Sequence, residues 1–403
     1  MQDNTSRPSV GIDLGTSRVR IAVGQKDNEN NFSIIGVGHA EISGMRKGSI
    51  TDLAGPAKAL NQALSEAERM SGLDLNQATF NINGSTILST NASGMVAVAS
   101  GEVTEEDLFR VEDVAKVGKL PANRAVLSIV PYDYILDGQA DIKDPVGMVG
   151  SRLELVASIV SVLAPHLQNV QKVAEMERMS VVEVVPSAIA AAQAVLTESE
   201  KENGVMLIDF GAATTGLAIY EEGSLKYISV LPVGSNNLTN DLAIGLQTTP
   251  DIAEIIKLGY ADAIETARDK QVSVKHDKIN HEFNLSVVDE VVNARLEELF
   301  DAVAAQLKKA GYVGKLPNGV VLVGGGANLK NITEFIKQKL GLATRIAKPS
   351  GFKGLADKVE SPEMATAVGL MMLNDLATPQ LSYNSHHKPG LLSRLFGGFK
   401  SKA

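Results

Sequence analysis

Residues 9–23 and 205–219 carry the same short pattern, and this internal repeat constrains the fold more than any other feature. The two stretches read SVGIDLGTSRVRIAV and VMLIDFGAATTGLAI. In each, an apolar run ends at an Asp-x-Gly triplet and alternating apolar residues follow, which is typical of a strand, a tight turn and a half-buried second strand. The copies begin at residues 9 and 205, close to half of the 403-residue chain apart. This period is too long for a solenoid and predicts a duplicated α/β domain.

Composition bounds the class of protein. With 403 residues and 44% hydrophobic residues, the chain is too long for one core and too apolar for a disordered protein. It has no cysteine, which excludes disulfides, thiolate zinc sites and cysteine nucleophiles, and its six histidines show no metal-ligand spacing. The net charge of −9 argues against a nucleic-acid partner, because phosphate neutralisation needs a basic surface. The polar N-terminus and the short apolar runs predict a cytoplasmic protein.

Each half consists of a framework and an insertion. Residues 85–164 change to short alternating segments with an acidic helix, which predicts an inserted α+β subdomain, and residues 247–311 are mainly helical and charged. The polar run TESEKENG at 197–204 predicts a hinge, and residues 378–389 predict a linker. Helices are expected at 52–71, 105–116, 165–179, 187–196 and 361–376, and a strand at 181–185.

The Asp-x-Gly triplet has the chemistry of a phosphate-binding hairpin. Asp13 ends a strand, Gly15 permits a tight turn, and Thr16 and Ser17 offer hydroxyl and N–H donors to an anion. The Asp13 carboxylate would hold water on Mg²⁺, which keeps several waters beside phosphates. A single hairpin of this kind is ordinarily only a turn. Two of them in tandem halves can face each other, and they predict a polyphosphate held between Asp13 and Asp209.

A third element, VVLVGGGANL at 320–329, is a short apolar strand that runs into Gly324, Gly325 and Gly326. Glycines let the backbone approach a ligand closely, and the helix expected next adds partial positive charge at its N-terminus. Tight packing alone would also explain such a turn. The spacing matches neither a dinucleotide-binding fingerprint nor a P-loop, so neither is expected.

Two Asp-x-Gly strands followed by a Gly-Gly-Gly strand resemble the actin-like ATPase superfamily. GMRKGSITD at 44–52, the helix ending AERMSG and the position of the first insertion are similar to the FtsA family of bacterial cell-division proteins, and the resemblance covers essentially the whole chain. It implies an α/β fold of actin-like duplicated domains flanking a nucleotide cleft, with an FtsA-type inserted α+β subdomain. The implied parts are subdomain 1A at 1–84 and 165–197 with helix 361–376, 1C at 85–164, 2A at 203–246 and 312–360, 2B at 247–311, a linker at 377–388 and a terminal helix at 389–403.

The resemblance implies ATP and Mg²⁺ as ligands. Asp13 would hold the metal through water, and Asp209 would lie near the attacking water. Glu254 and Lys257 match the family's nucleoside-contacting Glu-x-x-Lys, although a surface i, i+3 ion pair explains them equally well. The implied nucleotide-binding residues are Asp13, Gly15, Thr16, Ser17, Arg18, Asp209, Gly211, Ala212, Thr214, Thr215, Gly234, Ser235, Glu254, Lys257, Gly324, Gly325, Gly326 and Ala327.

One departure from the family bears on hydrolysis. Many relatives have a glutamate immediately before the proline that corresponds to Pro186, whereas this chain has Val185. A hydrocarbon side chain cannot accept a proton from water. Glu183 is on the same strand face but about 6.5 Å further along. We therefore expect slow or vestigial hydrolysis, with the nucleotide acting as an assembly switch.

The C-terminal stretch PGLLSRLFGGFKSKA at 389–403 predicts an amphipathic helix in a membrane interface. At about 100° per residue, its large apolar side chains share one arc and its basic side chains lie opposite, facing anionic head groups. The alternatives are a helix docked on the protein's own core and a frayed tail, because Gly397 and Gly398 weaken a helix. The expected membrane-binding residues are Leu391, Leu392, Arg394, Leu395, Phe396, Phe399 and Lys400.

The FtsA resemblance also implies partners. The second insertion would receive the C-terminal peptide of the tubulin-like division protein FtsZ, with Arg295 as the expected contact, although an i, i+3 pair with Glu298 explains Arg295 equally well. Copies of the chain would polymerise, and many tails on one filament would make attachment to anionic lipids firm. Other divisome proteins are also implied partners, and nucleic acid is not.

The implied function is an ATP-binding filament protein that tethers FtsZ filaments to the inner face of the cytoplasmic membrane at the division site. The alternative is a metabolic phosphotransferase of the same superfamily, such as a sugar or acetate kinase. The basic amphipathic tail favours the division protein, since a soluble kinase has no use for it. A rod-shape-determining filament protein is a nearer alternative, but it would not carry the 85–164 insertion.

Overall fold

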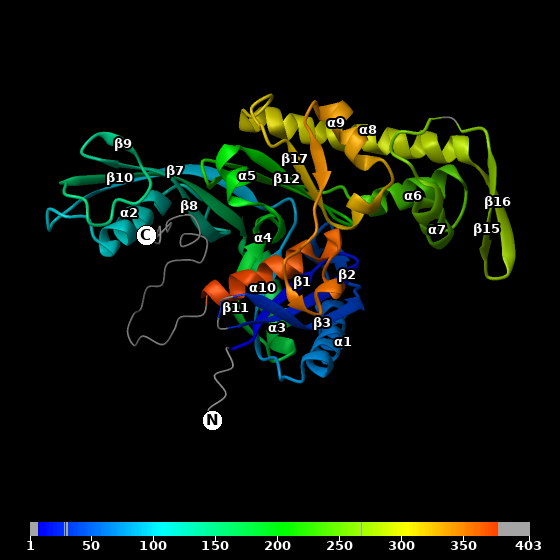
Figure 1. Cartoon of the computed structure of the whole chain (residues 1–403), viewed down its shortest axis with the longest axis horizontal. Coiled ribbons are helices and arrows are strands. Elements are labelled where there is room, and N and C mark those ends of the chain that lie inside the picture. Colours follow the sequence, from blue (N-terminus) through cyan, green and yellow to red (C-terminus); the bar gives the residue numbers. More distant parts are fainter. Residues whose placement is uncertain (1–6, 28, 30, 267, 378–403) are drawn as a thin grey trace.

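The structure, a computed structural model, describes residues 7–27, 29, 31–266 and 268–377 (Figure 1). Its first sheet contains β1 (Ser9–Leu14), β2 (Arg18–Lys26), β3 (Phe32–Glu41), β6 (Gln77–Ile82), β11 (Ser180–Pro186) and β19 (Lys353–Gly354). These strands lie in the order β11-β6-β1-β2-β3-β19. β1 and β2 form the first Asp-x-Gly hairpin, in which Asp13 pairs with Arg20, and β1 runs parallel to β6.

The second sheet repeats this arrangement. It contains β12 (Val205–Phe210), β13 (Thr215–Glu221), β14 (Ser224–Leu231), β17 (Val320–Val323) and β18 (Thr344–Ile346). The order β14-β13-β12-β17-β18 corresponds strand for strand to β3-β2-β1-β6-β11 of the first sheet. β12 and β13 form the second hairpin, in which Asp209 pairs with Gly216. The duplicated α/β architecture expected from the sequence repeat is therefore confirmed.

Helices cover both faces of the first sheet. α1 (Ala54–Ser71) packs against β2 and β3, whereas α10 (Ala365–Ala377) packs against β1 from the other face. Gly11 on β1 permits this approach, because a Cβ atom there would overlap the carbonyl oxygen of Ala367. α4 (Ser187–Val195) contacts α10 and also β12 and β13, so it joins the two sheets. α3 (Ala164–Met176) packs beside α1.

The first insertion forms a separate α+β unit at one end of the molecule (Figure 1). Its strands are β7 (Leu88–Ala97), β8 (Arg124–Leu136), β9 (Gln139–Ile142) and β10 (Arg152–Leu163), in the antiparallel order β7-β10-β8-β9. α2 (Glu105–Lys116) covers this sheet, and the buried Val111 and Ala115 join Leu153 and Leu155 in a hydrophobic cluster of its own. The expected inserted α+β subdomain is confirmed.

The second insertion combines helices with one hairpin, at the opposite end of the molecule (Figure 1). Its helix α7 (Pro250–Tyr260) packs on α6 (Ser235–Gly245), which precedes the insertion, and α6 packs on the long α8 (Leu285–Ala310). The hairpin of β15 (Gln271–His276) and β16 (Ile279–Asn284) precedes α8 and was not expected from the sequence. After β17 the chain forms the short helix η1 (Gly325–Asn328) and then α9 (Ile332–Leu340).

The expected hinge at 197–204 is wrong. These residues form the helix α5 (Glu198–Asn203), which a capping box stabilises: the side chains of Thr197 and Glu200 accept hydrogen bonds from each other's backbone N–H groups. The Thr-x-x-Glu spacing was a usable signal for a helix start. The remaining short elements are β4 (Met45–Arg46), β5 (Ser49–Ile50), η2 (Ala356–Lys358) and η3 (Pro362–Met364).

The linker expected at 378–389 and the amphipathic helix expected at 389–403 lie outside the described residues. Within the described part of the chain, no helix has the length and apolar character required to cross a membrane.

Candidate functional site

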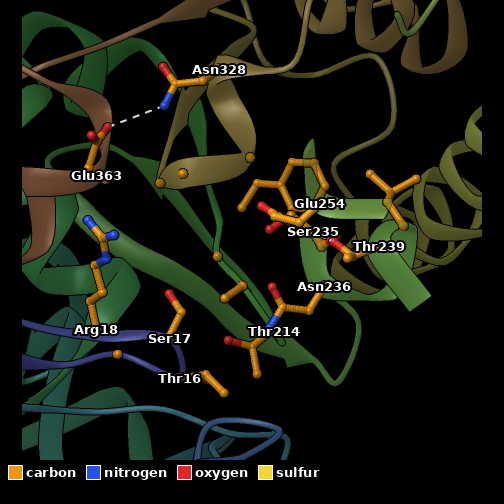
Figure 2. Close-up of a pocket in the computed structure, with 18 of the residues that line it drawn as sticks. Thr16, Ser17, Arg18, Thr214, Ser235, Asn236, Thr239, Glu254, Asn328 and Glu363 are labelled. Atoms are coloured by element: carbon orange, nitrogen blue, oxygen red, sulfur yellow. Dashed lines mark hydrogen bonds between the residues drawn. The ribbon is translucent and has the colours of Figure 1, made fainter. Parts of the chain in front are cut away.

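A cleft of about 720 Å³ lies between the two halves, which is ample for a small-molecule ligand. Both hairpin turns, the loop after β17, α6 and α7 contribute to its walls (Figure 2). Most residues that the sequence predicted for a nucleotide site line this one cleft. They are Asp13, Gly15, Thr16, Ser17, Arg18, Asp209, Gly211, Ala212, Thr214, Ser235, Glu254, Lys257, Gly324, Gly325 and Gly326.

In the first hairpin, the buried Asn81 at the end of β6 holds the Asp13 carboxylate. Asn81 Nδ2 donates to Asp13 Oδ1 at 2.6 Å and to Ser187 Oγ at 3.0 Å. Asn81 Oδ1 accepts from the backbone N–H of Leu14 at 2.7 Å, which fixes the orientation of the amide. The turn itself is closed by the N–H of Gly15, which donates to the carbonyl of Arg18 at 3.1 Å.

The second turn has the same closing bond and is supported by the start of α6. The N–H of Gly211 donates to the carbonyl of Thr214 at 2.9 Å. The N–H groups of Ser235 and Asn236 donate to the carbonyls of Gly211 and Ala212 at 2.9 and 2.7 Å. Gly234 makes this possible, because a Cβ atom there would lie 2.6 Å from the Ala212 backbone.

Both turns offer unused backbone donors to the cleft. Within the described part of the chain, the N–H groups of Thr16, Ser17 and Ala212 donate to no protein acceptor. All three residues line the cleft and none is fully buried. Successive free N–H groups in a turn form a concavity that binds anions. The arrangement therefore fits the phosphates of a nucleotide.

Two carboxyl groups share this cleft in an environment that disfavours their charge. Burial raises the pKa of Asp13 to about 7; the nearby Arg20 acts against this shift, and the charge of Asp209 adds to it. Burial likewise raises the pKa of Asp209 to about 6, again against the effect of Arg20. A bound divalent cation would relieve this cost, so the pair fits a hydrated Mg²⁺ ion. Among the described residues, no group of three or more metal-ligating side chains forms a direct metal cage.

The glycine turn after β17 brings backbone next to the second aspartate. Gly324 has a φ of +83°, and a Cβ atom there would lie 2.6 Å from the Phe210 carbonyl oxygen and 2.7 Å from Asp209 Oδ1. A Cβ atom at Gly326 would overlap the Phe210 ring, whereas one at Gly325 would meet nothing. The N–H of Gly324 donates to the Pro362 carbonyl at 3.0 Å, which ties the turn to the segment before α10.

Glu254 and Lys257 form an ion pair that also faces the cleft. Lys257 Nζ lies 2.6 Å from Glu254 Oε2, and the lysine side chain is 9% exposed. The hydroxyl of Thr239 donates to Glu254 Oε2 at 2.5 Å and accepts from Lys257 Nζ at 2.8 Å. Figure 2 shows Thr239 and Glu254 on the wall opposite Arg18. Glu254 and Lys257 therefore form the i, i+3 ion pair and also line the cleft.

Three predicted site residues do not line the cleft. Thr215 is fully buried, and its hydroxyl donates to the Val233 carbonyl at 2.8 Å. Ala327 is 1% exposed and packs in the core of the second half. Gly234 supports the second turn from behind, as described above.

Arg295 lies outside the cleft and is already paired. Its Nε and Nη2 atoms contact the Asp241 carboxylate at 2.5 and 3.1 Å, and its Nη1 atom contacts Glu298 at 2.6 Å. The pair with Glu298 was one of the two sequence interpretations, and the pair with Asp241 of α6 was not foreseen.

Val185 is fully buried in the first half and does not line the cleft. The structure therefore offers no carboxylate at the position that the family glutamate would occupy.

Sequence reasoning missed several residues that line the cleft, namely Arg20, Asn83, Ser187, Asn236, Thr239, Asn328 and Glu363. Arg20 had a signal, because pairing the two strands about the turn places it opposite Asp13. Asn328 and Glu363 had none: they meet across 35 residues of sequence, where Asn328 Nδ2 donates to Glu363 Oε2 at 3.3 Å (Figure 2).

Solved structures share this architecture. The type IV pilus PilM–PilN complex aligns with a TM-score of 0.67 and 14% identity, over 92% of this chain and 99% of that one. MreB5 of Spiroplasma citri bound to ADP aligns with a TM-score of 0.56 and 16% identity, over 91% and 95%. At such identities these matches show the fold alone. The fold is actin-like, as expected.

Sequence comparisons identify the family. A family model described as "Cell division protein FtsA" matches residues 206–369, and one described as "SHS2 domain inserted in FTSA" matches residues 84–161. The cell division protein FtsA of Pseudomonas aeruginosa is 34% identical over 90% of this chain and 88% of its own length. FtsA of Bacillus subtilis is 32% identical over 91% and 83%. The chain therefore belongs to the FtsA family of cell division proteins.

Proposed function

We propose that this FtsA-family protein binds ATP with Mg²⁺ in the cleft between its halves. The observation that carries the proposal is the convergence of two Asp-x-Gly turns on one cleft, with N–H donors that no acceptor in the described residues uses. Thr16, Ser17 and Ala212 would donate to phosphate oxygens, and Asp13 would hold the metal through water. When bound, the metal would offset the phosphate charge. The related fold of MreB5 is described with ADP bound.

The rest of the cleft suits the nucleoside end of the ligand. Gly325 would let the backbone approach it closely, because the space beside it is open, while Gly324 and Gly326 would hold the turn against Phe210 and Asp209. Glu254 and Lys257 would contact the nucleoside, with Ser235 beside them. Thr215, Gly234 and Ala327 would support the site without touching the ligand.

We expect hydrolysis to be slow. Asp209 would position the attacking water, but the residue before Pro186, where the family glutamate would accept the proton, is the buried hydrocarbon Val185. Phosphate release under multiple-turnover conditions tests this expectation. Several turnovers per second would contradict it.

The proposed cellular role is to attach FtsZ filaments to the cytoplasmic face of the membrane at the division site. Copies of the chain would assemble into filaments, other divisome proteins would join them, and the segment 389–403 would insert into anionic lipid. Subdomain 1A would comprise 1–84, 165–197 and the helix 361–376, and 1C would comprise 85–164. Subdomain 2A would comprise 203–246 and 312–360, 2B would comprise 247–311, and 377–388 would link the body to the tail. Family membership favours this role over a metabolic phosphotransferase.

Arg295 would contact the FtsZ C-terminal peptide by exchanging one of its present partners for a peptide carboxylate. Arg295→Glu would place three acidic groups together beside Asp241 and Glu298, which could weaken the helix packing by itself. Arg295→Met removes the charge while keeping the aliphatic stem. Weaker peptide binding by Arg295→Met with an unchanged melting temperature would support the contact, and unchanged binding would remove Arg295 from the site.

Co-sedimentation with vesicles of anionic lipid tests the role as a whole. The full chain should sediment more with ATP than without it, and should carry FtsZ with it. Deletion of 389–403 should abolish sedimentation while ATP binding persists. Sedimentation of the truncated protein would contradict the membrane assignment, and ATP turnover stimulated by a sugar or carboxylic acid would favour the phosphotransferase.

A further inference from the structure

We infer that Asn83, in the first half, positions the Thr214 hydroxyl of the second turn so that this hydroxyl donates into the cleft. The inference rests on the proposed ATP site and assigns a positioning residue to it. The hydrogen bond between Asn83 and Thr214 connects the two halves directly, and both halves would bind the proposed ligand.

The orientation of the Asn83 amide is fixed by its own neighbour. Asn83 follows β6, and its Oδ1 atom accepts from the backbone N–H of Gly84 at 2.8 Å. The amide nitrogen therefore points the other way, and Nδ2 donates to Thr214 Oγ1 at 3.1 Å. Both side chains line the cleft, and Thr214 is 3% exposed.

This bond determines what the Thr214 hydroxyl can do. A hydroxyl has one proton to donate, and its oxygen here already accepts from Asn83. Its proton must then point away from Asn83, and within the described part of the chain no protein acceptor receives it. Thr214 and Thr16 of the opposing turn both line the cleft (Figure 2). The hydroxyl proton is thus available to a phosphate oxygen held between the two turns.

A second contact holds Thr214 from the same side. Gly48, in the turn between β4 and β5, also lines the cleft, and a Cβ atom there would lie 3.0 Å from the Thr214 methyl carbon and 2.9 Å from the Gly84 nitrogen. The Thr214 carbonyl accepts from Gly211 and closes the second turn. The first half thus holds the hydroxyl and the methyl of the Thr214 side chain, and Thr214 closes the turn that would bind phosphate.

Isothermal titration of the full chain with ATP in excess Mg²⁺ tests the inference through a double-mutant cycle. Thr214→Val removes the hydroxyl and should weaken binding about tenfold, as expected for one hydrogen bond to a charged group. Asn83→Ala should weaken it about threefold to tenfold, because the hydroxyl proton is no longer directed. In the Thr214→Val background, Asn83→Ala should have little further effect. Thr214→Ser retains the hydroxyl and should restore most of the affinity.

Asn83→Asp keeps an oxygen that accepts from the Gly84 N–H but replaces the amide donor to Thr214 with a second oxygen. This variant tests the inference if Asn83→Ala does not fold. Its loss of affinity should exceed that of Asn83→Ala, and part of the loss should disappear in the Thr214→Val background. Full affinity in both Asn83 variants would overturn the inference while leaving the ATP site intact. Equal losses with and without the Thr214 hydroxyl would overturn it too. If the unaltered protein bound no ATP, the proposed function and this inference would both fail.

Discussion

The two Asp-x-Gly hairpins share a backbone course but differ in what holds the aspartate. Asp13 faces Arg20 across its hairpin and accepts a hydrogen bond from Asn81. Asp209 faces Gly216, and among the described residues no group donates to its carboxylate. Close packing fixes the Asp209 side chain, because the Gly324 backbone lies against it. Duplication thus preserved the turn, while the first aspartate became fixed by hydrogen bonds and the second by close packing.

Substitution of the glycine that packs against Asp209 should have the largest effect on the free energy of unfolding. Gly324→Ala should lower the free energy of unfolding by about 3 kcal/mol, because a positive φ costs about 1–2 kcal/mol and the clash with Phe210 and Asp209 adds a similar amount. Gly325→Ala is the matched control, since its Cβ atom would meet nothing, and it should change stability by less than about 0.5 kcal/mol. Urea unfolding measures both, and equal effects would contradict the close-packing account.

Asn81→Ala should be the most damaging polar substitution at the first hairpin. It leaves the Leu14 N–H, Asp13 and Ser187 without their shared partner, which should lower the free energy of unfolding by about 2–3 kcal/mol. Asn240→Ala, an exposed position that lines the cleft from α6, should be nearly neutral. Thermal melts compare the two. A neutral Asn81→Ala would show that hydrogen bonding does not fix the first aspartate.

Acid should act on the second half through Asp262, which forms a β-bridge with Lys330. Burial alone would raise its pKa, but hydrogen bonds from Lys330, Ile264 and Asn331 outweigh burial and lower the pKa to about 2. A carboxyl whose folded pKa lies below its unfolded value stabilises the protein above that value. About 2 kcal/mol of stability should therefore be lost as the pH falls from about 4 to 2. Denaturant titrations across this range should show a weaker pH dependence in Asp262→Asn, and an unchanged one would refute the assignment.

Arg20→Met should have the smallest of these effects and should appear in ligand affinity. Arg20 is the cation that acts on both Asp13 and Asp209, and it lines the cleft. Its loss should weaken binding of ATP with Mg²⁺ about tenfold, or about 1.4 kcal/mol. Arg69→Met is the matched control: Arg69 is an exposed residue of α1 that does not line the cleft, so we expect a change below about threefold. The reverse ranking would contradict the electrostatic account.

The sequence predicted the parts of the site that local pattern encodes. The Asp-x-Gly repeat and the glycine turn each carry their own signal, and they identified the residues that the structure brings to one cleft. Asn81, Asn83 and Thr239 carry no such signal, because their roles depend on which strands and helices become neighbours. Arg295 shows the same limit: Glu298 is one helical turn away in sequence, but Asp241 is reachable only through the packing of α6 on α8. The hinge predicted at 197–204 was wrong because the polar composition was given more weight than the capping box of Thr197 and Glu200, which indicates a helix start.

Hydrogen–deuterium exchange of the full chain, with and without ATP and Mg²⁺, tests most directly whether both halves hold one ligand. Peptides covering residues 14–18 and 210–215 should both become protected, because each turn has N–H groups that the ligand would engage and that bond to no acceptor among the described residues. The β15–β16 hairpin, which lies at one end of the molecule (Figure 1) and contributes no residue to the lining of the cleft, should exchange as before. Protection of one turn alone, or of neither, would contradict a ligand shared between the two halves.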